Sequence, residues 1–225
     1  MFRLYGLSIE ELVARNLIIS PRTTTECMID AHVECLLRGV TDIIGPGNES
    51  PGFDSAHPAV YDLFCGSGNI SYHIDRHLNR PVFASGLDLG VYKATTHNLA
   101  LLGVPSQNTN AGFSFTLSLA DYCNLLVSLS PMNHPSDLYI IEPPWGSAAS
   151  PDGLDLTKTS PPVQEIMAEI EHQRTGVPCY VALKALRNIT KNSLEIAMAK
   201  ATPIRVIQCS PVYGYGVDFH IYRLE

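Results

Sequence analysis

The stretch Glu142-Pro143-Pro144-Trp145-Gly146 places a carboxylate, two prolines and the chain's one tryptophan directly after the hydrophobic run LYII. Proline fixes its own backbone dihedral φ and has no N–H to pair in a sheet, so the two prolines hold their neighbours in a defined conformation. A tryptophan held in this way has an indole ring of fixed orientation, which suits stacking against a flat ligand. The alternative is a core tryptophan, which we expect less because a buried indole N–H needs a partner.

A second candidate group is the glycine-rich turn Gly66-Ser67-Gly68, which follows the run AVYDLF. The glycines permit a tight turn and a close approach of a ligand to the backbone, before a helix that we expect to begin near Asn69. Asp88 stands twenty residues after Gly68, at the end of the next apolar run, where an acidic side chain can accept both hydroxyl groups of a ribose. The turn and the acid together indicate a ligand that contains adenosine.

Asp121 follows the third apolar run and is the third candidate. Its carboxylate can accept a hydrogen bond from an adenine amino group, or it can serve as the N-cap of the next helix. A surface or capping carboxylate is also the alternative for Asp88. The dinucleotide pattern G-x-G-x-x-G is broken, because Ser71 stands three residues after Gly68, and this weakens a nicotinamide interpretation.

The elements that position these residues follow from the alternation of short apolar runs with helical patterns, which predicts a Rossmann-like α/β fold with a mostly parallel seven-stranded sheet. We expect helices on both faces and an antiparallel last strand, because a short glycine-bearing stretch joins the last two runs. Ligands of such sheets bind at the carboxyl ends of the strands. The strand runs are AVYDLF, VFASGLDL, FSFTLSLA, LYIIEP, CYVALKA, IRVIQC and VDFHIYRL, with helices near 69–79, 91–102, 163–173 and 190–200.

Two amphipathic helices are expected before the sheet, at 7–20 and 24–40, the second capped by one of Thr23, Thr24 and Thr25 and ended by Gly39. The stretch GPGNESPGFDSAHP, residues 45–58, reads as a loop. We expect residues 1–225 to form a single domain, with 1–45 as a helical lead-in and 59–225 as the core.

Composition limits the remaining possibilities. The net charge is −7, with 15 Lys and Arg against 22 Asp and Glu, which argues against tight binding along a nucleic-acid backbone but allows recognition of one RNA nucleotide in a pocket. No apolar run approaches a membrane span, and the first residues lack the order of a secretory signal. The six cysteines are scattered, so we expect separate core residues in a reducing compartment, no disulfide framework and no bound metal.

Taken together, DLFCGSGN, GLDL and LADY resemble the class I S-adenosylmethionine-dependent methyltransferases. The resemblance implies the Rossmann-like class I methyltransferase fold, S-adenosylmethionine as cofactor and S-adenosylhomocysteine as product. The second-strand acid, Asp88, would hold the ribose, and the third-strand acid, Asp121, would meet the adenine. The residues implied to bind the cofactor are Asp62, Phe64, Gly66, Gly68, Asn69, Asp88 and Asp121.

The tryptophan motif resembles that of the trimethylguanosine synthase family, the RNA-cap guanine-N2 methyltransferases, and the similarity extends over about residues 18–223. It implies that the chain transfers methyl groups to the exocyclic amine of a 7-methylguanosine cap, with the catalytic segment Glu142, Pro143, Pro144 and Trp145 at the amine. Trp145 would stack on the cationic 7-methylguanine. Arg187, with Asn188 beside it, would contact the cap phosphates.

Some residues depart from that family's pattern. Glu142 replaces a serine, Ser147 replaces a glycine, Leu186 replaces a proline, and the glycine-rich turn is one residue shorter. Two alternatives therefore stay open: methylation of an internal guanine (N2) or adenine (N6) of ribosomal or other RNA, and an inactive module that binds cofactor or cap. We expect a monomer in the nucleus, the cytoplasm or both, with capped RNA as partner and no binding to membrane or DNA.

Overall fold

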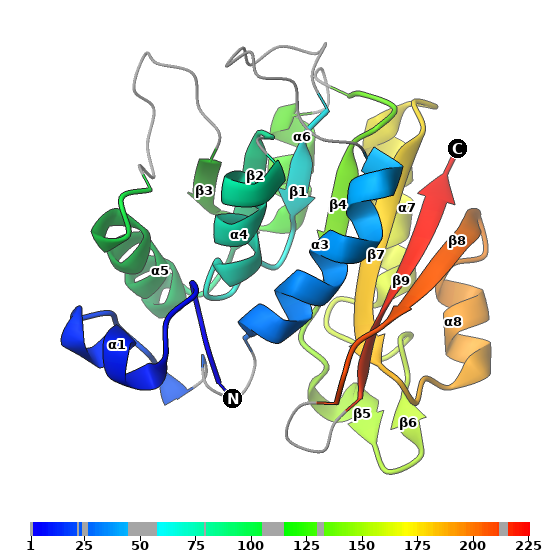
Figure 1. Cartoon of the computed structure of the whole chain (residues 1–225). Helices are drawn as coiled ribbons and strands as arrows, with labels where there is room; N and C mark the ends of the chain where they lie inside the picture. The colour runs from blue at the N-terminus through cyan, green and yellow to red at the C-terminus, as the bar shows by residue number, and fades with distance from the viewer. Residues whose placement is uncertain are drawn as a thin grey trace.

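The computed structural model describes residues 2–21, 23, 27–44, 58–78, 80–104, 115–129, 133–211 and 216–225. Within them the apolar runs form strands and the segments between them form helices (Figure 1). The strands are β1 (Val60–Asp62), β2 (Val82–Gly86), β3 (Phe115–Leu119), β4 (Leu138–Ile141), β5 (Ala149–Ser150), β6 (Gly153–Leu154), β7 (Cys179–Leu186), β8 (Ala201–Gln208) and β9 (Val217–Leu224). The helices are α1 (Ile9–Ala14), α3 (Asp30–Ile44), α4 (Asn69–Leu78), α5 (Leu89–Leu101), α6 (Tyr122–Leu129), η2 (Gly146–Ala148, a 3-10 helix), α7 (Val163–Arg174) and α8 (Lys191–Ala197).

Seven strands form one sheet in the order β3-β2-β1-β4-β7-β9-β8. The first five are parallel neighbours, whereas β9 pairs antiparallel with both β7 and β8. The predicted mostly parallel sheet with an antiparallel last strand is therefore confirmed. β5 and β6 form a separate hairpin at the bottom of Figure 1, on the side where the parallel strands end.

Alternate side chains of the strands enter two hydrophobic cores, one on each face of the sheet. Ile140 belongs to the core under α3 and α4, and its neighbour Ile141 belongs to the core under α6 and α7. Every residue of β1 and β4 is buried. Strands that are covered on both faces need continuous apolar runs, which explains why the sequence pattern identified them.

A buried ion pair closes the amino end of β4. Asp137, the residue before the strand, pairs with Arg174 at the end of α7, and both side chains are at least 98% buried. The Arg174 guanidinium also donates to the carbonyls of Val177 and His134. The Asp137 carboxylate accepts from the backbone N–H of Ala59 and of His134, both at 2.8 Å. The pair thereby joins α7 and the segments that lead into β1 and β4.

The predicted lead-in helices are placed differently in the structure. The first is only α1, which begins with a capping box between Ser8 and Glu11. The second begins at Asp30 and runs through Gly39 to Ile44, so Gly39 does not end it. A Cβ atom on Gly39 would lie 2.2 Å from Cδ1 of Ile207 in β8, which shows that this glycine permits close packing of helix on strand.

Some predictions fall outside the described residues. They concern the caps Thr24 and Thr25, nearly all of the predicted loop at 45–58, and residues 212–215 of the turn before the last strand. Within the described ranges, no helix combines the length and apolarity that a membrane span requires.

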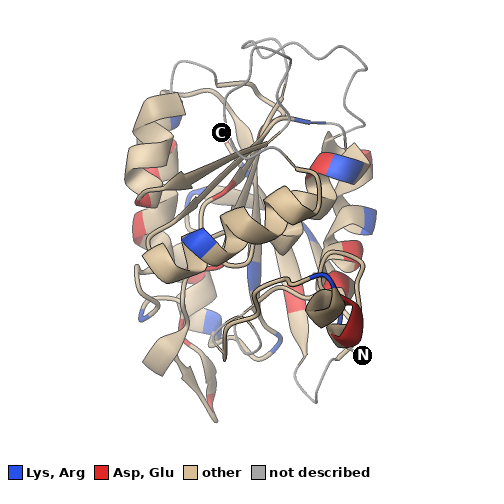
Figure 2. Ribbon diagram, turned by 90° about the vertical axis from the view of Figure 1, so that its left-hand side faces the viewer, with Lys and Arg blue, Asp and Glu red and all other residues tan. Residues whose placement is uncertain are grey.

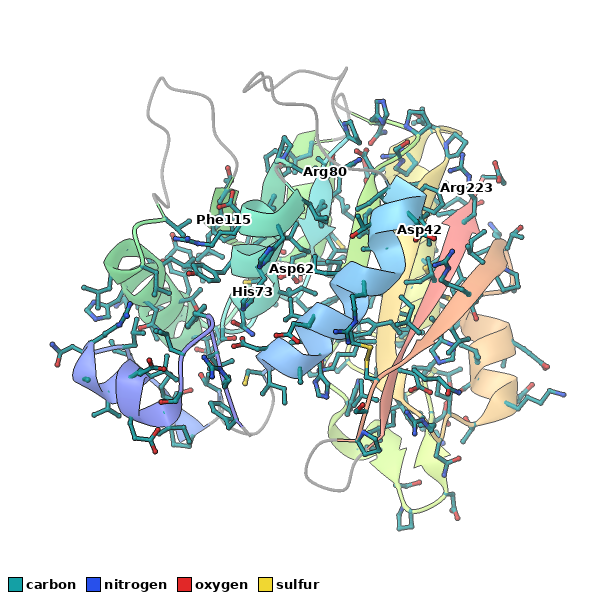
Figure 3. All side chains as sticks on the ribbon, viewed as in Figure 1. Asp42, Asp62, His73, Arg80, Phe115 and Arg223 are labelled. Atoms are coloured by element: carbon teal, nitrogen blue, oxygen red, sulfur yellow. A yellow bond between two sulfur atoms is a disulfide. The ribbon has the colours of Figure 1, made fainter. Side chains whose placement is uncertain are left out.

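The expectation that all six cysteines are separate core residues is wrong. Cys35 of α3 and Cys209, directly after β8, form a disulfide (Figure 3). The two residues are 174 positions apart in sequence, but α3 packs across β8 and brings their Cα atoms to 5.8 Å. The other four cysteines, Cys27, Cys65, Cys123 and Cys179, are free thiols.

Candidate active site

The candidate residues gather because four parallel strands end at one edge of the sheet. In the sheet order β3-β2-β1-β4, the chain leaves these strands next to Asp121, Asp88, Asp62 and Glu142, respectively. The carboxyl edge therefore carries an acidic residue at or just after the end of each of four neighbouring strands. This is the edge at which open α/β sheets bind ligands.

The glycine-rich turn after β1 requires its glycines. Gly66 and Gly68 have φ values of 47° and 70°, in the left-handed region that other residues avoid. A Cβ on Gly68 would lie 2.9 Å from Cγ2 of Thr95, whereas space within 4 Å of Gly66 is open. Gly68 thus permits close packing on α5, and Gly66 presents bare backbone at the carboxyl edge.

Asn69 connects this turn to the N-terminal segment. Its side chain donates to the carbonyl of Met28 and accepts from the N–H of Tyr5. The hydroxyl group of Tyr5 donates to the carbonyl of Ser67 inside the turn. The lead-in therefore lies directly against the glycine-rich turn, while a contact between Asn69 and a cofactor stays a prediction.

Asp62, labelled in Figure 3, ends β1 in the interior of the protein. Its carboxylate accepts a hydrogen bond of 2.6 Å from the Ser71 hydroxyl. Burial raises the pKa of Asp62 to about 7, and the nearby charge of Glu142 also raises it. An Asp62 side chain that titrates near neutral pH is suited to bind a cation, because a positive charge would restore the ionised form.

Asp88 and Asp121 each cap a helix. Oδ1 of Asp88 accepts from the backbone N–H of Gly90 and Val91 at the start of α5. Oδ1 of Asp121 accepts from the N–H of Cys123 at the start of α6. The capping alternative is thus realised for both acids. Their predicted contacts with ribose and adenine stay predictions.

Apolar side chains at the same edge were missed in the sequence. Leu87, Leu89 and Leu119 are 70%, 51% and 45% exposed, although each lies at or just after the end of β2 or β3. Phe64 and Tyr122 stand nearby with ring centroids 5.4 Å apart. Apolar groups left in water at a strand end are informative about binding. A search for such residues just past each strand would have found them.

The tryptophan motif follows β4, as expected. Pro143 is buried and Pro144 is exposed, with the Pro144 carbonyl accepting from the N–H of Ser160. Trp145 is partly buried against the core under α7. Its indole Nε1 is shielded from solvent and has no hydrogen-bond partner among the described residues.

Lys184 is the functional candidate that sequence reasoning missed. It lies within β7, is only 4% exposed, and pairs through Nζ with Oε1 of Glu142. The ammonium also lies 5.8 Å from the centroid of the Trp145 ring. The signal was a lysine inside the apolar run VALKAL, since a buried ammonium group requires an anionic partner.

The loops that carry Trp145 and Arg187 are tied together by the β5-β6 hairpin. The N–H of Leu154 donates to the carbonyl of Asn188 at 2.8 Å, and a Cβ on Gly153 would lie 2.8 Å from the same oxygen. Arg187 is 43% exposed and pairs with the buried Asp218. Its guanidinium therefore already has a carboxylate partner, and its contact with cap phosphate stays a prediction.

Comparisons with known proteins show that this chain shares its fold with solved structures, at low sequence identity. No protein-family model and no curated protein matches the chain. Among solved structures, TrmN from Thermus thermophilus matches with a TM-score of 0.53 and 16% identity over 88% of this chain and 49% of that one. The N-methyltransferase NodS from Bradyrhizobium japonicum WM9 matches with a TM-score of 0.52 and 7% identity over 87% of this chain and 94% of that one. The protein yhhF from Escherichia coli, described as a methyltransferase, matches with a TM-score of 0.50 and 13% identity over 89% of each chain.

The chain has the Rossmann-like fold of class I methyltransferases. At these identities the likeness establishes the fold, and the activity has to be argued from the residues at the carboxyl edge. The described residues contain no group of histidine, cysteine, aspartate and glutamate side chains that could hold a metal ion.

Proposed function

We propose that the chain is an S-adenosylmethionine-dependent methyltransferase that methylates the exocyclic amine of an RNA base, and that this base is the 7-methylguanine of an RNA cap. The observation that carries the proposal is the position of Glu142 and Trp145, which follow β4 on the same sheet edge as the glycine-rich turn and Asp62. An acceptor base held there would lie next to a cofactor held by the turn.

The residues of the carboxyl edge fit the parts of S-adenosylmethionine, which supplies a methyl group bonded to a positively charged sulfur. Asp62 would bind the ammonium of the methionine part, since a cation stabilises the ionised form of a buried carboxyl. Bare backbone at Gly66 admits a close ligand. Asp88 would accept the ribose hydroxyls, and Asp121 the adenine amino group. The exposed leucines would cover the two faces of the adenine ring.

The acceptor base would stack on Trp145, and a 7-methylguanine cation would gain about 1–2 kcal/mol from an indole face when partly desolvated. Glu142 would accept hydrogen bonds from the base N–H groups, which fixes the exocyclic nitrogen with its lone pair toward the methyl group. The new N–C bond forms as the S–C bond breaks, and the amine then releases a proton to water or to Glu142. Positioning supplies most of the rate enhancement in such an in-line transfer.

An internal guanine or adenine of RNA is the second candidate, and Lys184 favours it. An ammonium 5.8 Å from the Trp145 ring makes stacking of a second cation less favourable than stacking of a neutral base. Charge distribution favours the cap instead, because basic and acidic positions are interspersed on the face shown in Figure 2, and the net charge is −7. An internal site usually needs a basic surface for the flanking backbone.

The test incubates the protein and S-adenosylmethionine with 7-methylguanosine diphosphate, guanosine diphosphate, and short RNA oligonucleotides without a cap. Product mass gives the number of methyl groups added. A gain on the 7-methylated compound alone supports the cap. A gain on the oligonucleotides alone contradicts the cap and supports the internal base, and no gain on any acceptor contradicts both.

A further inference from the structure

Two side chains from outside the glycine-rich turn hold its backbone. Thr95 of α5 donates from its hydroxyl group to the carbonyl of Gly66 at 2.9 Å, and Tyr5 of the lead-in donates from its phenol to the carbonyl of Ser67. The Tyr5 hydroxyl also interacts with the side chain of Asn98 in α5. Neighbouring carbonyls of the turn are therefore held by residues 29 and 62 positions away in sequence, and the second of these residues belongs to the lead-in.

The backbone of Tyr5, which is 3% exposed, has a conformation that is unfavourable for a tyrosine. Its φ is 56° and that of Gly6 is 79°, so two successive residues lie in the left-handed region. In this region the Cβ atom of a residue other than glycine comes too close to the backbone. Such a conformation persists only where surrounding contacts enforce it, and residues of this kind often lie at ligand sites. Tyr5 must therefore be held by contacts that outweigh this cost.

Asn69, the first residue of α4, holds the Tyr5 backbone. Its Oδ1 accepts from the N–H of Tyr5 at 2.6 Å, and its Nδ2 donates to the carbonyl of Met28 at 2.7 Å and to Oδ1 of Asp30 at 3.0 Å. A side-chain amide has two N–H donors, so these two bonds use both of them. The side chain is 1% exposed. Asn69 therefore directs its donors into the lead-in and not toward the carboxyl edge.

Asp30, the first residue of α3, holds Gly6 in the same way. Its Oδ2 accepts from the N–H of Gly6 at 2.9 Å, and its Oδ1 accepts from Asn69 and lies 3.0 Å from Nε2 of His73 in α4. Each of the two left-handed residues thus donates its N–H to a buried side chain. We call Tyr5, Gly6, Asp30 and Asn69 the N-terminal clamp. The clamp joins the lead-in, α3 and α4 directly beside the glycine-rich turn.

We propose that Tyr5 and Asn69 are positioning residues for the cofactor: they hold the glycine-rich turn in the conformation that receives it, without touching the cofactor themselves. This inference rests on the proposed function for the identity of the cofactor. Without the clamp, Gly66 and Gly68 would sample other backbone conformations, because glycine populates positive and negative φ about equally. Ordering the turn would then oppose ligand binding and lower the affinity.

The first test compares Y5F with Y139F. Tyr139 of β4 is equally buried, and its hydroxyl group accepts from Arg174, whose pair with Asp137 closes the amino end of the strand. Both variants should lower the urea midpoint slightly, because each loses buried hydrogen bonding. Calorimetry should show that only Y5F binds S-adenosylhomocysteine more weakly, by about 3- to 10-fold. Wild-type affinity in Y5F would contradict the role of the Tyr5 hydroxyl.

A double-mutant cycle shows whether Asn69 acts through Tyr5 or on the cofactor directly. N69A should weaken S-adenosylhomocysteine binding about 10- to 30-fold, because it releases the Tyr5 backbone. The variant with both Y5F and N69A should bind only slightly more weakly than N69A, since both changes release the same segment. Additive losses would indicate a direct contact between Asn69 and the cofactor, and the proposal would be wrong. N69S replaces N69A if the latter does not fold.

A readout without ligand separates this proposal from the proposed function. The N–H of Gly68 donates to the carbonyl of Cys65 at 2.7 Å, so its hydrogen exchange reports how often the turn opens. NMR should show exchange of this amide roughly 10-fold faster in Y5F and N69A than in the wild type, and unchanged in Y139F. Wild-type exchange in both clamp variants would overturn the inference. If the wild type does not bind S-adenosylhomocysteine, the proposed function fails, and Gly68 exchange alone decides whether the clamp orders the turn.

Discussion

An ion pair lies at each end of β4. Both members of the amino-end pair are buried, whereas Glu142 of the carboxyl-end pair is 18% exposed. At the amino end, Arg174 meets Asp137 and several backbone carbonyls. At the carboxyl end, Lys184 meets Glu142, and its ammonium lies 5.8 Å from the ring of Trp145, whose indole N–H has no partner among the described residues. The first arrangement is complete as it stands and serves the fold. The second has unused hydrogen-bonding capacity, which is what a ligand needs.

Removal of the amino-end pair should have the largest effect on stability. In R174M the Asp137 carboxylate is left buried without its cation, which costs about 3–5 kcal/mol. Urea denaturation should show this loss, while K200M, which breaks the exposed pair between Lys200 and Glu171, should cost less than about 1 kcal/mol. A loss below about 1 kcal/mol in R174M would contradict the structural role of this pair.

W145A tests the carboxyl end by binding. We expect affinity for 7-methylguanosine diphosphate to fall roughly 5- to 30-fold, which corresponds to the ~1–2 kcal/mol of cation stacking. Affinity for S-adenosylmethionine should change little, and W145F should keep part of the acceptor affinity. Calorimetry measures both ligands. Unchanged acceptor affinity in W145A would exclude stacking on this indole.

The ionisation of Asp62 should make both the free energy of unfolding and the cofactor affinity depend on pH. Its folded pKa of about 7 lies above the unfolded value of 3.8, so the folded protein binds more protons between these two values. The free energy of unfolding should therefore decrease as pH rises from about 4 to 7, and D62N should remove this contribution. Cofactor affinity should rise roughly 10-fold from pH 6 to 8 as Asp62 ionises. A pH-independent affinity would contradict the ammonium contact.

Substitutions of Asp88 should have the smallest effects on stability and on cofactor affinity. The residue caps α5 and is also proposed to bind the ribose, so two variants are needed to separate these roles. D88A removes the cap of α5 and should cost about 1 kcal/mol of stability. D88N keeps a capping oxygen, so its stability should stay near that of the wild type while affinity for S-adenosylmethionine falls about 3- to 10-fold. Equal cofactor affinity in D88N and the wild type would leave Asp88 as a cap alone.

The parts of the molecule that depend on local patterns could be predicted from the sequence. Ile140 and Ile141 belong to a run that is buried on both faces, and such runs identify parallel strands. The acids and the tryptophan follow strand ends, which topology brings together at one edge. For the same reason, the sheet and the position of the candidate site at its carboxyl edge could be predicted from the sequence.

Features that depend on distant contacts could not be predicted in this way. Gly39 looked like a helix end, but its role is set by Ile207, which lies far along the chain. Cys35 and Cys209 meet only because α3 crosses β8. Lys184 finds Glu142 across 42 residues of sequence, through the pairing of β7 with β4. In each case the contact partner depends on how helices and strands pack in three dimensions. Local composition and residue spacing do not determine that packing.

The insertion of β9 between β7 and β8 also has a consequence for the order of folding. β8 precedes β9 in the chain, yet it pairs with β9 and is separated from β7 by it. The strand that carries Lys184 therefore exposes an open edge until β9 has been synthesised and docked, because β8 alone cannot cover it in this arrangement. Open edges of this kind attract other chains, and long-range pairing is slow. We therefore expect the Lys184 side of the candidate site to be the last part to assemble and the part most exposed to misassociation on the way.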